Sequence, residues 1–117
     1  MSKPITDPWV PVCAAAEIAI NDAFNFEHQD CYFAIFRLQD GRYYATDGLC
    51  THEAVELADG YVDGEFVECP MHQARFHIPT GAARSAPACV NLRTWPVKIV
   101  AATVFIDLSD WVQPNSL

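Results

Sequence analysis

The sequence predicts an all-β domain. Short runs rich in aromatic and β-branched side chains recur along the chain, and clusters of Gly, Pro, Asn and Asp separate them. No segment combines helical apolar periodicity with the length of an ordinary helix. The chain has 117 residues, which is enough for one domain with a modest core.

The N-terminal half predicts four strands and two hairpin turns. Pro11 favours an edge position for the first strand, because proline cannot donate a ladder hydrogen bond. Residues 14–20 contain helix formers but allow at most one helical turn. Gln29-Asp30 is a turn candidate, and Asp40-Gly41 is a strong hairpin signal between two apolar runs. The predicted strands cover residues 9–13, 24–28, 31–38 and 42–46.

The C-terminal half predicts shorter strands. Asp59-Gly60 and Asp63-Gly64 punctuate the chain, and Pro79-Thr80-Gly81 marks a further turn. Residues 82–88 are expected to form a loop, and Ala101-Ala102 a tight turn between the last two strands. The predicted strands cover residues 61–62, 65–68, 74–78, 91–100 and 103–108.

Composition limits the partners and the compartment. The net charge of −8 argues against nucleic-acid binding, which requires a basic surface. It serves solubility, or it steers the protein toward basic patches on partner proteins. No apolar run reaches the length of a membrane span, and the N-terminus lacks the apolar segment of a signal peptide. We therefore expect a cytoplasmic protein that does not bind membranes.

Two short loops carry candidate metal ligands. Cys50 and His52 form a C-x-H box, and Cys69 and His72 form a C-x-x-H box after the intervening residues 53–68. Each box offers one thiol and one imidazole, whereas structural zinc sites usually pair like ligands in each arm. Mixed boxes suit a 2Fe–2S centre in which one iron takes two Cys and the other takes two His.

In these boxes the chain resembles the Rieske ferredoxins, and in particular the soluble electron carriers of bacterial aromatic-ring-hydroxylating dioxygenase systems. The resemblance implies a Rieske-type fold of small antiparallel sheets, with a 2Fe–2S cluster held at one tip by Cys50, His52, Cys69 and His72. It covers nearly the whole chain, so we expect a single domain over residues 1–117 with its cluster-binding part at 47–88. The matching residues are Cys50-Thr51-His52, Leu57-Ala58-Asp59-Gly60, Asp63-Gly64, Glu68-Cys69-Pro70-Met71-His72, Arg75-Phe76, Thr80-Gly81, Pro87 and 95–99.

The resemblance also implies a role and partners. Such a carrier accepts single electrons from a flavin-containing ferredoxin reductase and passes them to a terminal Rieske oxygenase, without substrate chemistry of its own. A monomer is the expected state for a shuttling protein of this size. Pro87 is expected to lie in a third loop that covers the cluster. The rim that partners touch is predicted to comprise Leu49, Val55, Met71, Gln73 and Pro87.

Departures from the wider family predict a low reduction potential. High-potential Rieske proteins carry an additional Cys in each ligand loop, where this chain has Val55 and Met71, so a disulfide clamp cannot form. They also carry hydroxyl groups that donate to sulfur, at positions filled here by Ala74 and Phe76. Such donors stabilise the more negative reduced state. We therefore expect a value toward the bottom of the Rieske range, which spans about −150 to +300 mV.

Two alternatives use the same four residues. The first is a structural zinc domain, because two Cys and two His suit tetrahedral zinc. The second is the Rieske part of a catalytic oxygenase, which we disfavour because the last predicted strand ends at residue 108 of 117 and leaves no room for a mononuclear iron domain. The remaining candidates are expected to have ordinary structural or surface roles: His28, His77, Cys13, Cys31, Cys89, Glu53, Glu56 and Asp59.

Overall fold

The computed structural model describes residues 8–50, 55–70, 74–85 and 90–111, and it confirms the all-β prediction. The two helical segments in these ranges are single 3-10 turns, η1 (Ala15–Glu17) and η2 (Leu57–Asp59), and neither is long or apolar enough to cross a membrane. The strands are β1 (Trp9–Ala14), β2 (Asp22–His28), β3 (Cys31–Arg37), β4 (Tyr43–Asp47), β5 (Tyr61–Asp63), β6 (Phe66–Glu68), β7 (Arg75–His77), β8 (Ala83–Ser85), β9 (Thr94–Trp95), β10 (Val97–Val100) and β11 (Thr103–Asp107).

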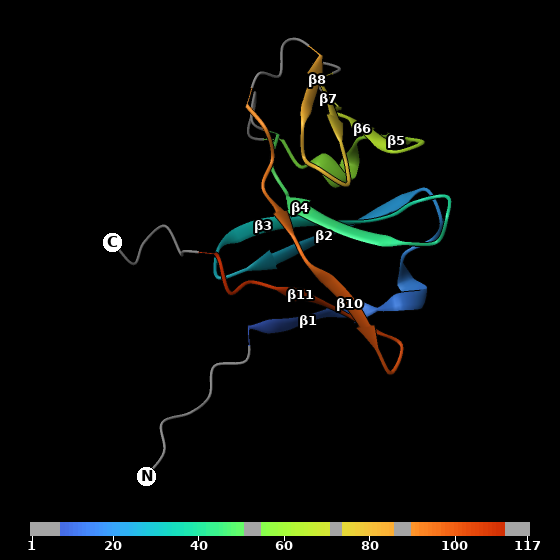
Figure 1. Cartoon of the computed structure of the whole chain (residues 1–117), viewed down its shortest axis with the longest axis vertical. Coiled ribbons are helices and arrows are strands. Elements are labelled where there is room, and N and C mark those ends of the chain that lie inside the picture. The colour runs from blue at the N-terminus through green and yellow to red at the C-terminus, as the bar shows by residue number, and fades with distance from the viewer. Residues whose placement is uncertain (1–7, 51–54, 71–73, 86–89, 112–117) are drawn as a thin grey trace.

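The strands form three antiparallel sheets that follow one another along the long axis of the molecule (Figure 1). The base sheet has the order β1-β11-β10, and the middle sheet has the order β2-β3-β4-β9. The third sheet, β5-β6-β7-β8, lies at the opposite end from the base sheet (Figure 1). Each of its strands is only three residues long.

Strand β3 separates two cores because it is buried on both faces. Phe33 and Ile35 point toward the base sheet, whereas Ala34 and Phe36 point toward the third sheet. We call the first group of buried residues the aromatic core: Ile18, Phe33, Ile35, Ala45, Trp95, Val104, Ile106 and Leu108. We call the second group the cysteine core: Ala34, Phe36, Leu38, Cys50, Leu57, Val67, Cys69, Ala74, Phe76, Ile78 and Leu92.

Several predicted turns and edges are confirmed. Strand β1 pairs only with β11 and carries an irregularity after Pro11, as expected of an edge strand. Gln29 and Asp30 have φ values of 50° and 65°, and Ala101 and Ala102 have 50° and 64°. Two consecutive residues with positive φ are typical of the tight hairpin turns whose twist matches the flanking strands.

Two predictions for the C-terminal half are wrong. Residues 82–88 were expected to form a loop, but Ala83–Ser85 forms β8 and pairs with β7. Gly81, with φ of 77°, turns the chain back along β7, and the sequence Ala83-Arg84-Ser85 of this edge strand has no apolar alternation. The predicted strand at 91–100 is split at Pro96: Thr94–Trp95 pairs with β4 in the middle sheet, and Val97–Val100 pairs with β11 in the base sheet.

Candidate metal centre

The structure buries two of the four predicted ligands in one core. Cys50 is 5% exposed and Cys69 is 1% exposed, and both belong to the cysteine core. They come from segments far apart in the chain: Cys50 follows β4, and Cys69 follows β6. His52 and His72 lie outside the described residues, as do Glu53, Met71, Gln73, Pro87 and Cys89.

The two cysteines begin loops that are closed in the same way. The Cys50 backbone N–H donates to the carbonyl of Val55 at 2.9 Å, and the Cys69 N–H donates to the carbonyl of Ala74 at 2.7 Å. In each loop the bond joins a cysteine to the residue five positions later. The two boxes differ in sequence spacing, yet a backbone hydrogen bond of the same span closes both loops.

Backbone contacts fix the stem of the first loop. The Gly48 N–H donates to the Tyr32 carbonyl at 2.8 Å, and the Gly48 carbonyl accepts from the Leu57 N–H at 2.8 Å. A Cβ atom at position 48 would lie 2.7 Å from the backbone of Tyr32 and Phe33, so only glycine allows this approach. The fully buried Leu57 of η2 then anchors the far side of the loop in the cysteine core.

A short hairpin supports the second loop. Strands β6 and β7 pair Val67 with Phe76 and Glu68 with Arg75, which brings Cys69 and Ala74 to the end of the hairpin. Ala74 and Phe76 are fully buried and offer no hydroxyl group. Both side chains belong to the same core as the two cysteines, so they are placed to influence the polarity around the sulfur atoms.

The donor chemistry fits an iron–sulfur cluster. Cys50 and Cys69 place two thiols in one buried core. Thiolate sulfur is the ligand that such clusters require, and two equal loops bring one thiol each. Within the described ranges, no three His, Cys, Asp or Glu side chains form a group that could hold a metal ion, so the described acidic residues add no ligand to the thiols.

The other described candidates have structural partners. The two His77 ring nitrogens contact Thr80 Oγ1 and Glu65 Oε1, both at 2.8 Å. His28 packs against Phe26 and Trp111. Cys13 and Cys31 are half-buried against the aromatic core, and Asp59 Oδ1 accepts from Asn25 Nδ2 at 3.2 Å. Burial, and secondarily the charge of Glu17, raise the pKa of the Cys13 thiol.

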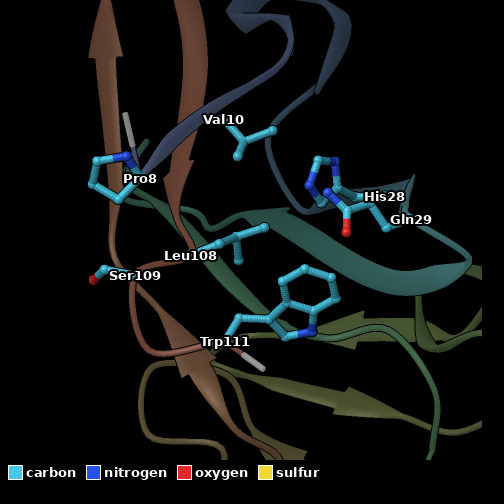
Figure 2. A pocket seen from close by; sticks show the side chains of 7 residues that line it. All are labelled: Pro8, Val10, His28, Gln29, Leu108, Ser109 and Trp111. Carbon is cyan, nitrogen blue, oxygen red and sulfur yellow. The ribbon is translucent and has the colours of Figure 1, made fainter. Parts of the chain in front are cut away.

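A cavity of about 640 Å³ lies at the edge of the aromatic core. Side chains from β1 and the residue before it, from the end of β2 and the following turn, and from the segment after β11 surround it (Figure 2). Neither Cys50 nor Cys69 is among its lining residues, which are Pro8, Val10, His28, Gln29, Leu108, Ser109 and Trp111. This cavity therefore belongs to a different part of the molecule from the two cysteines.

One residue of the first loop's stem was missed by the sequence analysis. Asp47 was interpreted only as part of a turn with Gly48. In the structure its carboxylate accepts from the backbone N–H and Nε of Arg93 and from Trp95 Nε1. No local motif could have shown these contacts, because the partners lie 46 and 48 positions further along the chain.

Comparisons with known proteins agree with this geometry. The family model described as "Rieske [2Fe-2S] domain" matches residues 8–96. The ferredoxin component of the naphthalene 1,2-dioxygenase system of Pseudomonas aeruginosa is 41% identical over 105 residues, which cover 90% of this chain and 100% of that protein.

Solved structures show the same fold. The chain aligns with a protein in the complex of reduced oxygenase and oxidised ferredoxin of carbazole 1,9a-dioxygenase with a TM-score of 0.81 and 30% identity, covering 87% of this chain and 94% of that chain. The ferredoxin of Sphingomonas yanoikuyae B1 aligns with a TM-score of 0.79 and 35% identity, covering 84% and 96%. The chain therefore belongs to the Rieske [2Fe-2S] domain family, carries a Rieske-type 2Fe–2S cluster, and is an electron-carrying ferredoxin and not an enzyme.

Proposed function

We propose that this protein is the ferredoxin component of a multicomponent, aromatic-ring-hydroxylating dioxygenase system. It carries single electrons from a flavin-containing ferredoxin reductase to a terminal Rieske oxygenase. The observation that carries the proposal is the 41% identity to a naphthalene dioxygenase ferredoxin over that protein's full length. The similarity to the carbazole 1,9a-dioxygenase proteins, whose structure holds oxygenase and ferredoxin together, supports an oxygenase as one partner.

We assign the cluster ligands to Cys50, Cys69, His52 and His72, with both cysteines on one iron and both histidines on the other. The shared burial of the two thiols and the matching closure of their loops support the cysteine pair. The C-x-H and C-x-x-H spacing supports the histidine pair. When bound, the cluster supplies one-electron chemistry at a potential raised by its imidazole ligands. The protein's own part is to fix the ligand loops and exclude water.

The proposed carrier is of the low-potential type. The Ala74 and Phe76 side chains are buried in the same core as the cysteines and carry no hydroxyl group that could donate to sulfur. Sulfur without such donors leaves the reduced cluster less stabilised. We therefore place the reduction potential toward the lower end of the range of about −150 to +300 mV.

The remaining features of the proposal concern location and assembly. The described cysteines Cys13, Cys31 and Cys69 are free, as is usual in the reducing cytoplasm. The net charge of −8 favours short encounters with basic surfaces of redox partners. We propose a cytoplasmic monomer whose 117 residues form one domain, with residues 47–88 around the cluster.

Reconstitution tests this function. The cluster-loaded protein is mixed with the reductase and oxygenase components of a naphthalene dioxygenase system, without their own ferredoxin. We expect NADH-dependent reduction of the cluster, followed by its reoxidation when the oxygenase is added, both followed by stopped-flow absorption. Loss of both reactions in a Cys69→Ser variant is the control. A loaded wild-type protein that neither component can reduce or oxidise would contradict the proposal.

A further inference from the structure

Asp47 makes more directed polar contacts than the end of a strand requires. One carboxylate oxygen, Oδ2, accepts from the backbone N–H of Arg93 at 3.1 Å and from its Nε at 3.0 Å. The other, Oδ1, accepts from Trp95 Nε1 at 3.3 Å. The Asp47 backbone N–H donates to the Arg93 carbonyl at 2.9 Å. A single residue thus joins the end of β4 to Arg93, which precedes β9, and to Trp95, which ends it.

The carboxylate takes the place of a backbone acceptor. In a hydrogen-bonded antiparallel pair, each residue donates its N–H to the carbonyl of the other. Here the Arg93 N–H bonds to the Asp47 side chain, while the Asp47 carbonyl accepts from the buried Thr46 hydroxyl at 2.7 Å. The side chain therefore satisfies the Arg93 N–H at the point where the chain leaves the middle sheet and turns into the first ligand loop at Gly48.

The Arg93 segment is also bound to the third sheet. The Leu92 N–H donates to the Gly81 carbonyl at 2.8 Å, and the Gly81 N–H donates to the His77 carbonyl at 2.6 Å. Gly81 lies so close to this segment that a Cβ atom there would be 2.2 Å from the Leu92 carbonyl oxygen. Residues 92 and 93 consequently connect the hairpin of the second ligand loop to the stem of the first.

We propose that Asp47 is a positioning residue for the cluster, because its carboxylate sets the separation between the two ligand-loop stems. The proposal rests on the ligand assignment made above. Hydrogen-bond acceptance matters more than charge in this role, because the Arg93 side chain is 61% exposed and an exposed ion pair contributes little. The contacts to the Arg93 N–H and to Trp95 survive removal of the Arg93 side chain but not removal of the Asp47 carboxylate.

Variants of the loaded protein separate these contributions. We compare Asp47→Ala, Asp47→Asn and Arg93→Ala by the half-life of the visible cluster absorption in air, the reduction potential and the EPR line shape. The matched control is Asp107→Ala at the end of β11 in the base sheet, where the carboxylate accepts from the Ser109 N–H at 2.8 Å. Unfolding of each variant is measured in parallel to correct for general loss of stability.

We expect Asp47→Ala to shorten the cluster half-life about tenfold, since it removes three hydrogen bonds to the carboxylate, of which the bond from Trp95 Nε1 is partly buried. Water that then reaches the cluster stabilises the more negative reduced state, so the potential should rise and the EPR line shape should change. Asp47→Asn should fall between Asp47→Ala and wild type, because its amide oxygen still accepts one hydrogen bond. Arg93→Ala and Asp107→Ala should keep the wild-type half-life and potential.

Two results would overturn the positioning role. One is an Asp47→Asn protein whose half-life and potential match those of Asp107→Ala; this comparison remains valid if Asp47→Ala does not fold. The other is an Arg93→Ala protein whose cluster half-life and reduction potential change as much as those of Asp47→Ala. That result would show that the ion pair, and not the remaining hydrogen bonds of Asp47, protects the cluster. Failure of the ligand assignment itself is recognised separately, since wild-type protein would then lack a Rieske EPR signal.

Discussion

The two faces of β3 support two different kinds of core. On one face, rings close the aromatic core: Phe33 contacts Trp95 and Trp111 edge-to-face, with centroid distances of 5.9 and 5.8 Å. On the other face, the cysteine core combines aliphatic side chains and two Phe rings with the buried thiols of Cys50 and Cys69. Ordinary packing can sustain the first core, whereas the second encloses the two thiols that we propose as cluster ligands.

Strand length reinforces this difference. Strands β2 and β3 pair over seven residues each, whereas the strands of the third sheet are three residues long. A sheet of such short strands gains little from its own ladder. We infer that ligation of the cluster, which joins the two loops, supplies much of the stability of the third sheet.

The largest expected effect is loss of the cluster. A Cys69→Ser variant should lose the visible absorption of the cluster and the slow amide hydrogen exchange of β5–β8, while β2–β4 stay protected. Exchange measured by mass spectrometry on wild-type and variant protein checks this result. If β2–β4 lost protection to the same extent as β5–β8, the two cores would unfold as one unit.

Two glycines of the third sheet sharpen the comparison. Gly81 has φ of 77° and would place a Cβ 2.2 Å from the Leu92 carbonyl oxygen, whereas Gly64 has φ of 61° and open space around it. Gly64→Ala should cost only the backbone strain, about 1 kcal/mol of unfolding free energy. Gly81→Ala adds a clash and should cost about 3 kcal/mol or more. Denaturant titration checks both, and equal costs would contradict the close approach of Leu92 to Gly81.

Trp111 tests the aromatic core alone. It packs on His28 and Phe33, with centroid distances of 5.6 and 5.8 Å, and is half-buried. Trp111→Ala should lower the free energy of unfolding by about 2 kcal/mol, less than for a fully buried tryptophan. The reduction potential and the cluster absorption should not change. A shift in either one would mean that the two cores are coupled through β3.

Phe76→Tyr tests the cysteine core. The added hydroxyl enters a fully buried position in the same core as Cys50 and Cys69. A hydrogen bond from it to sulfur, worth about 1 kcal/mol in favour of the reduced state, should raise the potential by a few tens of mV. Protein-film voltammetry measures the shift. An unchanged or lower potential in a variant that keeps its cluster would contradict this explanation of the low potential.

The smallest effect concerns Cys13. Burial, with help from Glu17, raises the pKa of its thiol, so less thiolate is present at any given pH. Alkylation of Cys13 in the folded protein should therefore be slower at pH 8 than alkylation of a free model thiol, and its rate should still rise at pH values where the model thiol has levelled off. A pH profile like that of the model thiol would contradict the raised pKa.

Local patterns predicted the strands and turns that depend on local chemistry. Asp40-Gly41 and Ala101-Ala102 were predicted as turns from neighbouring residues alone, and both are turns in the structure. Pairing between segments that are distant in the sequence was harder to predict. Strand β8 exists because Gly81 returns the chain to β7, and its sequence Ala83-Arg84-Ser85 carries no strand signal.

The same difference between local patterns and long-range contacts applies to the candidate site. The spacing of the boxes was enough to select Cys50 and Cys69, which the structure then buries in one core. The contacts of Asp47 could not be predicted from the sequence, because only the folded middle sheet brings Arg93 and Trp95 beside it. Sequence therefore indicated the two thiols that we propose as cluster ligands, but not the contacts that hold their loops.

The proposed ligand set is tested most directly by pulsed EPR on the dithionite-reduced protein, grown once with unlabelled histidine and once with 15N-histidine. We predict a rhombic signal of a reduced 2Fe–2S cluster with hyperfine couplings from two histidine nitrogens, which change to 15N couplings on labelling. Replacement of His52 or His72 should remove this signal. A reduced cluster without histidine coupling, or a colourless protein that binds one zinc ion, would contradict the assignment.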